Sequence, residues 1–195
     1  MTQIFDAEGR AYPATVISAG PIVVTQVKSK ETDGYESVQV GFGEQKESRL
    51  SKAVKGHTKA TGNFRHLEEF RIDAPTMKVG DKIDVSTFKV GEMVSVRSES
   101  KGKGFQGGVK RYHFRGGPRT HGQKHSEREV GTISGGGRGG SGRVAKGKRM
   151  PGRMGGDMIS VRNLSILQID PATNTLVVKG SLPGRRGALV RIIEK

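Results

Sequence analysis

The sequence predicts a mainly β fold, a closed antiparallel barrel that carries a small α-containing insertion and one long, basic, extended loop. Short runs rich in β-branched residues recur along the chain, separated by close turn signals, and few segments have helical spacing. This combination is typical of antiparallel barrels. One stretch departs from it, because residues 97–156 hold 18 of the 30 glycines and 15 of the 34 Lys and Arg residues. That stretch predicts the extended loop.

Four strands are expected in the first 43 residues. Gly20-Pro21 links the second run to the third, and Asp33-Gly34 between two strand-like runs predicts a hairpin. The run after this hairpin alternates apolar and polar residues with a period of two, as a half-buried strand does. The strands are expected at residues 2–5, 14–18, 22–28 and 35–42.

A helix is expected in the next segment, because residues 48–55 have helical spacing, with Ser48 as N-cap and Gly56 at the end. Residues 64–70 fit either a short turn of helix or a strand. We expect residues 44–75 to form a small insertion on the strand scaffold. Further strands are expected at residues 82–88, 92–97, 158–169, 175–179 and 188–193.

The strands on both sides of the basic stretch define the expected domain organisation. The barrel body would comprise residues 1–43, 76–100 and 156–195, and the insertion residues 44–75. The extended loop, rich in Gly, Arg and Lys, would occupy residues 101–155 and connect two barrel strands. We call this loop the arm.

Composition excludes several classes of site and segment. The 195 residues include no cysteine, which rules out disulfides, cysteine-based zinc sites and thiol catalysis. No run approaches the roughly 18 apolar residues that a membrane-spanning helix needs. The first residues, MTQIFD, lack the basic and apolar regions of a signal peptide. Binding to a membrane surface would need an amphipathic helix, which the glycine content of the arm disfavours.

The charge of the chain indicates a polyanionic partner. The net charge is +15, and residues 97–156 contribute +12 of it, with Glu99, Glu127 and Glu129 as their acids. Residues 97–156 have too little apolar surface for its burial to offset the conformational entropy lost on ordering. We therefore expect the arm to be disordered when free. Nucleic acid is the default candidate. Aromatic residues are interleaved and arginines alternate with glycines, which suits phosphate contact and base stacking.

Motifs for enzymes and cofactors fail in this chain. Residues 102–107 match G-x-G-x-x-G, but no helical pattern follows and the next acid lies inside a basic run. Residues 142–148 match G-x-x-x-x-G-K, but Arg149 stands where a phosphate loop needs Ser or Thr. His121 and His125 have an i, i+4 spacing that could ligate a metal, but without a helical pattern RNA stacking or phosphate contact fits better. We therefore expect no catalytic residue, no metal site, no cofactor and no enzymatic activity.

Residues 100–111, SKGKGFQGGVKR, resemble the signature of the third protein of the large ribosomal subunit, a universal family. The signature has Ser or Thr, then Gly, a basic residue and Gly, then Gly, then Arg. Upstream, Phe88 and Ser98 also fit, whereas Ser95 stands where the family usually has Asp or Asn. The stretches GGPRTHGQKHSERE and GRVAKGKRMPGRMGG resemble the bacterial form, so that the resemblance covers essentially the whole chain. The signature positions are filled by Ser100, Gly102, Lys103, Gly104, Gly107 and Arg111.

The resemblance implies a barrel of the translation-protein type with a loop that runs through large-subunit RNA. It also implies that the loop approaches the peptidyl-transferase region, and that the protein binds early in assembly, in cytoplasmic ribosomes, beside other large-subunit proteins. The limbs of the loop would be residues 101–129 and 143–153, and its tip residues 134–142. Family members usually begin several residues before the match to Met1. Bacterial members often carry a methyl-accepting Gln near the tip, which is absent here, so that modification is not expected.

The predicted function is a structural constituent of the large ribosomal subunit that binds its rRNA directly. The alternative is a free RNA chaperone or single-strand RNA-binding protein. Arms of that kind usually repeat RGG at a terminus, whereas this one is internal, irregular and flanked by strands. Neither a membrane nor a small-molecule substrate is expected as a partner.

The predicted rRNA-binding residues all lie in the arm. Its cations would neutralise phosphates, with Arg138 penetrating deepest, while its aromatic and histidine side chains would stack or fill gaps. These residues are Lys101, Lys103, Phe105, Lys110, Arg111, Tyr112, Phe114, Arg115, Arg119, His121, Lys124, His125, Arg128, Arg138, Arg143, Lys146, Lys148, Arg149 and Arg153.

Overall fold

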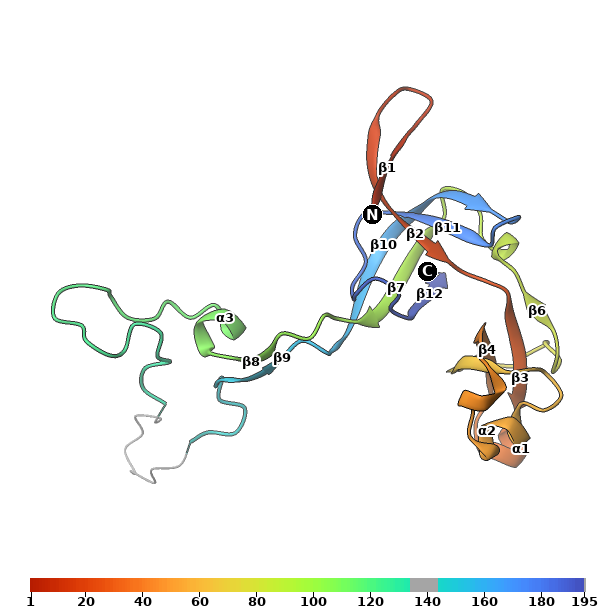
Figure 1. The fold of residues 1–195 in the computed structure, drawn as a ribbon, viewed down its shortest axis with the longest axis horizontal. Helices are drawn as coiled ribbons and strands as arrows, with labels where there is room; N and C mark the ends of the chain where they lie inside the picture. The colour runs from red at the N-terminus through yellow and green to blue at the C-terminus, as the bar shows by residue number, and fades with distance from the viewer. Residues whose placement is uncertain (134–143, 195) are drawn as a thin grey trace. The chain divides into compact units, whose positions relative to one another are not determined.

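The computed structural model describes residues 1–133 and 144–194 (Figure 1). Strands hold 39% of these residues and helices 11%, which confirms a mainly β fold with few helices. No helix in the described part of the chain is long and apolar enough to cross a membrane. The chain forms two compact units: Met1–Ser95 with Arg162–Leu182 and Ile193–Lys195, and Val96–Val161 with Pro183–Ile192.

The larger sheet has six strands in the order β1-β2-β11-β10-β7-β12. Strands from opposite ends of the sequence meet in it, because β2 pairs antiparallel with β11, with Ile17 opposite Leu176. β-Branched and aliphatic side chains of these strands are fully buried, among them Val94, Ile166 and Val178. The strands are β1 (Thr2–Phe5), β2 (Ala11–Ser18), β7 (Met93–Glu99), β10 (Met158–Asp170), β11 (Thr175–Lys179) and β12 (Val190–Glu194).

The smaller sheet has four strands in the order β5-β4-β3-β6. Its core is formed by Val24, Val38 and Val40, on which further apolar side chains pack. β3 and β4 pair antiparallel side by side, and their alternating apolar residues place these valines on one face of the sheet. The strands are β3 (Ile22–Lys28), β4 (Ser37–Glu44), β5 (Phe64–Phe70) and β6 (Lys82–Ile83).

The predicted hairpin at Asp33-Gly34 is confirmed, but one turn of helix lies within it. β3 and β4 pair antiparallel, and α1 (Lys30–Asp33) connects them. Ser29 caps α1 by accepting from Thr32 N, and Gly34 ends it with φ of 80°. That left-handed conformation is the one for which glycine is the usual C-terminal residue.

The helix expected at residues 48–55 exists, but its predicted limits are wrong. A 3-10 turn at Glu47–Arg49 comes first, and α2 spans Lys52–His57. The N-cap is therefore Ser51, whose hydroxyl accepts from Val54 N at 3.4 Å, and not Ser48. Both serines suit a cap, and the choice follows from Leu50, which takes an extended conformation between the two turns.

The structure corrects one other segment and decides an alternative left open at a second. The segment predicted as one strand at residues 82–88 is the short β6 followed by a 3-10 turn at Val85–Thr87. Val85 is 1% exposed, so its apolar character reflects core packing and not a strand. Residues 64–70, which fitted either structure, form the strand β5 paired with β4.

The strand pairings of the described residues make two open sheets and one two-stranded ribbon. A closed barrel is not found in this part of the chain, so the barrel stays a prediction from the sequence. The ribbon belongs to the arm and consists of β8 (Gly104–Gln106) and β9 (Gly152–Met154). The arm also contains α3 (Gly108–Tyr112), which follows β8 directly (Figure 1).

Candidate nucleic-acid interface

The two limbs of the arm are held together by backbone hydrogen bonds at its base. Ser100 N donates to Asp157 O at 2.9 Å, and Asp157 N donates back to Ser100 Oγ at 3.2 Å. Lys103 N donates to Met154 O at 2.9 Å, and the β8–β9 ribbon continues the pairing. The arm therefore leaves and returns at neighbouring positions. That the arm is disordered when free stays a prediction.

Glycine is required where the limbs approach each other most closely. Gly155 has φ of 74°, and a Cβ there would overlap the carbonyl oxygen of Lys101. A Cβ on Gly152 would in turn meet Nη1 of Arg111. Part of the glycine content thus permits tight pairing of the two limbs.

Arg111 connects α3 to the returning limb. Its Nη1 donates to Met150 O at 2.9 Å, and its guanidinium carbon lies 4.9 Å from the centroid of the Tyr112 ring. Arg149 approaches the same ring at 5.7 Å, and the ring of Phe114 lies 5.9 Å from it. The structure therefore brings four of the predicted RNA-binding residues together as one cation–π and aromatic cluster. Arg111 is half-buried in it and is used within the protein.

A second cluster closes the loop after α3. Gly117 N donates to Glu127 O at 2.8 Å, and Arg119 Nε donates to Glu127 Oε1 at 2.6 Å. This hydrogen bond and the negative charge of Glu127 raise the pKa of the exposed Arg119 guanidinium above its ordinary value. Gln123 Nε2 donates to Ser126 Oγ at 2.7 Å inside the loop. The sequence indicated only that Glu127 is an acid within a basic run, and did not predict that it shapes this loop.

Most predicted phosphate-binding cations are exposed, as contact with RNA requires. Phe105 is 77% exposed on β8, opposite Arg153 on β9, and can stack on a base. Arg138 and Arg143 lie outside the described residues. The described cations and histidines of the arm that are exposed are Lys101, Lys103, Lys110, Arg115, Arg119, His121, Lys124, His125, Arg128, Lys146, Lys148, Arg149 and Arg153.

The structure brings no metal-ligand set together in the described residues, where no group of three or more His, Cys, Asp or Glu side chains could hold an ion. His121 has φ of 60° in a turn, so it and His125 do not share a helix face. Their exposure leaves them available to stack or to contact phosphate.

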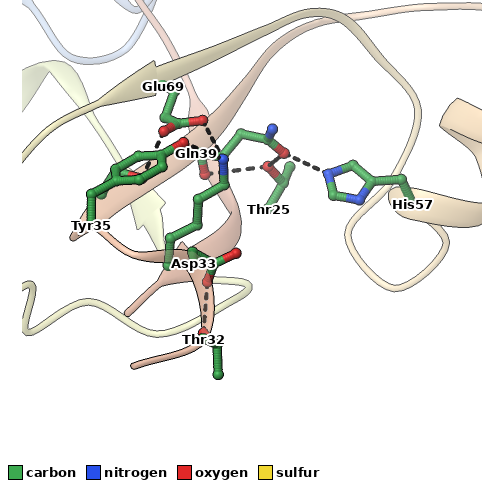
Figure 2. A network of polar contacts seen from close by, with 9 residues as sticks. Thr25, Thr32, Asp33, Tyr35, Gln39, His57 and Glu69 are labelled. Atoms are coloured by element: carbon green, nitrogen blue, oxygen red, sulfur yellow. Dashed lines mark hydrogen bonds and ion pairs between the residues drawn. The ribbon is translucent and has the colours of Figure 1, made fainter. Parts of the chain in front are cut away.

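A network of polar side chains outside the arm lies on the four-stranded sheet (Figure 2). Lys28 Nζ donates to Tyr35 Oη at 2.8 Å and to Glu69 Oε2 at 2.7 Å, and Ser37 Oγ donates to Glu69 Oε1 at 2.8 Å. The hydrogen bond from Lys28, with those of Tyr35 and Ser37, lowers the pKa of Glu69 from 4.5 to about 2. The hydrogen bonds from Lys28 to Glu69 and to Tyr35 raise the pKa of Lys28 above its ordinary value. The groups satisfy one another, which makes this cluster a structural one.

Comparisons with known proteins find relatives that match nearly the whole chain. A model of the family described as ribosomal protein L3 matches residues 68–175. The large ribosomal subunit protein uL3 of Corynebacterium jeikeium is 47% identical over 193 residues, which cover 97% of this chain and 88% of that protein. The protein of the same name from Carboxydothermus hydrogenoformans is 47% identical over 197 residues, which cover 100% of this chain and 92% of that protein. A Dehalococcoides mccartyi protein of this name is also 47% identical, with 98% and 92% covered.

Proposed function

The chain belongs to the ribosomal protein L3 family, and from this premise we propose that its arm binds large-subunit rRNA directly. The protein is a structural constituent of the large ribosomal subunit and not an enzyme. It works in the cytoplasm as part of the ribosome, with rRNA and other ribosomal proteins as its partners.

One observation carries the proposal for the arm. Residues 97–156, which include the arm, contribute +12 of the net charge of +15, and most of their described cations are exposed. In the described residues of the arm, Arg119 alone pairs with an acid. The Lys and Arg side chains without an acidic partner belong to an arm whose two limbs are joined by backbone hydrogen bonds. Such cations suit the phosphates of folded RNA, which bind them with release of counterions.

The roles of the individual residues follow from their surroundings. Exposed cations such as Lys103 and Arg153 contact phosphates, and Phe105 stacks on an unpaired base. Arg111, Tyr112 and Phe114 maintain the shape of the arm and reach RNA through their exposed edges. For Arg138 and Arg143, which lie outside the described residues, the proposal rests on their charge and on the family: they contact RNA, and the tip of the arm approaches the peptidyl-transferase region. The protein binds early in assembly, because an arm that threads between RNA helices must be in place before they pack.

We further propose that the two open sheets are parts of a barrel of the translation-protein type. The short link at residues 19–21 supports this, because it takes the chain from β2 in one sheet directly to β3 in the other. The body would comprise residues 1–43, 76–100 and 156–195, with the insertion at residues 44–75.

Sedimentation of a cell extract through a sucrose gradient in high salt tests the proposed function. An arm threaded into rRNA keeps the protein with the large subunit even where salt weakens its phosphate contacts, because the RNA helices around the arm must open before it can leave. Release of the protein to the top of the gradient would instead support a free RNA chaperone that binds ribosomes only peripherally.

A further inference from the structure

The cations outside the arm are concentrated in one loop. Residues 45–63 close the hairpin between β4 and β5, where Gln45 N donates to Asn63 O at 3.1 Å. The loop carries five Lys and Arg residues against one acid, a net +4. Residues outside both this loop and residues 97–156 sum to −1. The excess positive charge of the body therefore lies in this segment, which we call the hairpin loop.

The hairpin loop is fixed to the four-stranded sheet by side chains. His57 Nε2 of α2 lies 2.6 Å from Gln39 Oε1 on β4, and Thr25 Oγ1 of β3 donates to the same oxygen at 2.9 Å (Figure 2). Thr58 follows α2, is 1% exposed, and donates through Oγ1 to Val54 O at 3.0 Å. A loop anchored in this way loses little conformational entropy when it binds a partner.

Most cations of the hairpin loop have no acidic partner. Lys55 pairs with Glu47, the one acid of the loop, at 3.1 Å. Isolated surface cations are ordinarily only solvated, but several unpaired ones on one fixed loop create a local positive potential. The remaining cations are exposed and make no ion pair in the part of the chain that the structure describes; they are Lys46, Arg49, Lys52 and Lys59.

The surface suits RNA better than protein. Protein interfaces centre on buried aromatic or aliphatic anchors and are depleted in lysine. The hairpin loop exposes no large hydrophobic side chain, because Leu50 and Val54 are both partly buried. Its charged groups are five-to-one basic in sequence, and exposed Lys and Arg side chains are groups that contact the RNA backbone without reading its sequence.

We propose that the hairpin loop binds the phosphate backbone of large-subunit rRNA as a second contact, separate from the arm. The inference rests on the proposed function, since it takes the same rRNA as ligand. The two contacts together anchor both the body and the arm, so that each cation of the hairpin loop adds to the salt dependence of binding.

The test compares three full-length triple variants in binding to a transcript of the large-subunit rRNA, with transfer RNA as competitor. The hairpin variant carries Lys46→Gln, Arg49→Gln and Lys52→Gln. The matched control, Lys78→Gln, Lys82→Gln and Lys89→Gln, removes the same charge from exposed positions outside the hairpin loop. The arm variant carries Lys101→Gln, Lys103→Gln and Lys110→Gln. Circular dichroism melting confirms that each variant folds.

The hairpin variant should lower the magnitude of the slope of log affinity against log salt by about 2 to 3, since each lost phosphate contact removes about 0.7 to 0.9. Its affinity near 0.1 M salt should fall at least about tenfold, and that of the control by less than about twofold. An unchanged slope, or an equal change in the control, overturns the inference. So does a hairpin variant that binds rRNA normally but is missing from purified subunits, because the loop then faces a ribosomal protein.

The arm variant separates the two proposals. If its slope falls while that of the hairpin variant does not, the inference fails and the proposed function stands. If neither the arm variant nor the wild-type chain shows a salt-dependent affinity for the transcript, the proposed function itself fails.

Discussion

Glu69 makes the stability of the four-stranded sheet depend on pH. Lys28, Tyr35 and Ser37 lower its pKa from 4.5 to about 2, so the folded state favours the carboxylate. A lowered pKa contributes stability that is present above the unfolded value and is lost as pH falls through the folded one. We expect the wild-type chain to lose stability as the pH falls from 4.5 to about 2. The Glu69→Gln variant should lack the loss that is due to protonation of Glu69, and it should be less stable than the wild type at pH 7. Urea unfolding at each pH measures both effects.

The control for this experiment is Glu44→Gln, which neutralises an exposed carboxylate at the end of β4. It should follow the wild-type pH dependence. If Glu69→Gln also follows it, the hydrogen bonds to Glu69 do not contribute to folding in solution.

The side chain of Arg111 joins two segments that are distant in the sequence. We expect Arg111→Lys to keep the charge but to lose the hydrogen bond to Met150 O and the stacking on Tyr112. A hydrogen bond from a charged group contributes about 1.5–3 kcal/mol, so exchange of the β9 amides should quicken roughly tenfold or more. Hydrogen exchange detected by mass spectrometry measures this, with the exposed neighbour Lys110→Gln as control. Unchanged exchange with weaker RNA binding would instead assign Arg111 to the RNA.

At the scale of elements, the base of the arm depends on glycine at the point where the limbs meet. Gly155→Ala places a Cβ onto the carbonyl oxygen of Lys101 at a positive φ, so both strain and overlap oppose it. We expect this substitution to remove exchange protection from the β8–β9 ribbon and to weaken rRNA binding. Gly102→Ala is the matched control, because a Cβ there meets nothing within 4 Å. Equal behaviour of the two variants would show that the ribbon does not form in solution.

Local signals predicted most elements of the fold. β1, β3 and β11 have the predicted limits, because each is a short β-branched run bounded by turn residues. Ser51 rather than Ser48 caps α2, and β6 ends early, because tertiary packing decided between alternatives that the local pattern allowed equally. Whether the strands close into a barrel depends on pairing between distant segments, which periodicity does not encode.

The candidate site was predicted from its charge, but not from its internal contacts. Composition alone identified the exposed cations, since such a segment cannot be a core. Nothing in the sequence indicates that Arg111 reaches Met150 or that Glu127 closes a loop through Gly117, because both contacts need a particular path of the backbone. The expectation that the arm is disordered when free considered apolar burial and omitted the backbone pairing at its base. It stays a prediction, which amide exchange of the free protein tests.

For the whole molecule, the distribution of charge predicts how binding responds to salt. If about ten arm cations meet phosphates, the arm alone should contribute about −7 to −9 to the slope of log affinity against log salt, and the hairpin loop should make the slope of the full chain steeper. Deleting residues 101–155 should leave only the shallower dependence of affinity on salt that is due to the body. Filter binding to the rRNA transcript across a salt series measures both. A slope near −3 for the full chain would mean that most of these cations remain in solvent.

The bonds between Ser100 and Asp157 also have an evolutionary consequence. Because the arm begins and ends at one point, inserting or removing residues far from that point changes only the closure entropy of a loop, about 0.6 kcal/mol for each doubling of length. The arm is thus a segment that can be replaced as a unit. It can lengthen, shorten or be grafted from one relative onto another as the RNA around it diverges, while the strands that carry it keep their register.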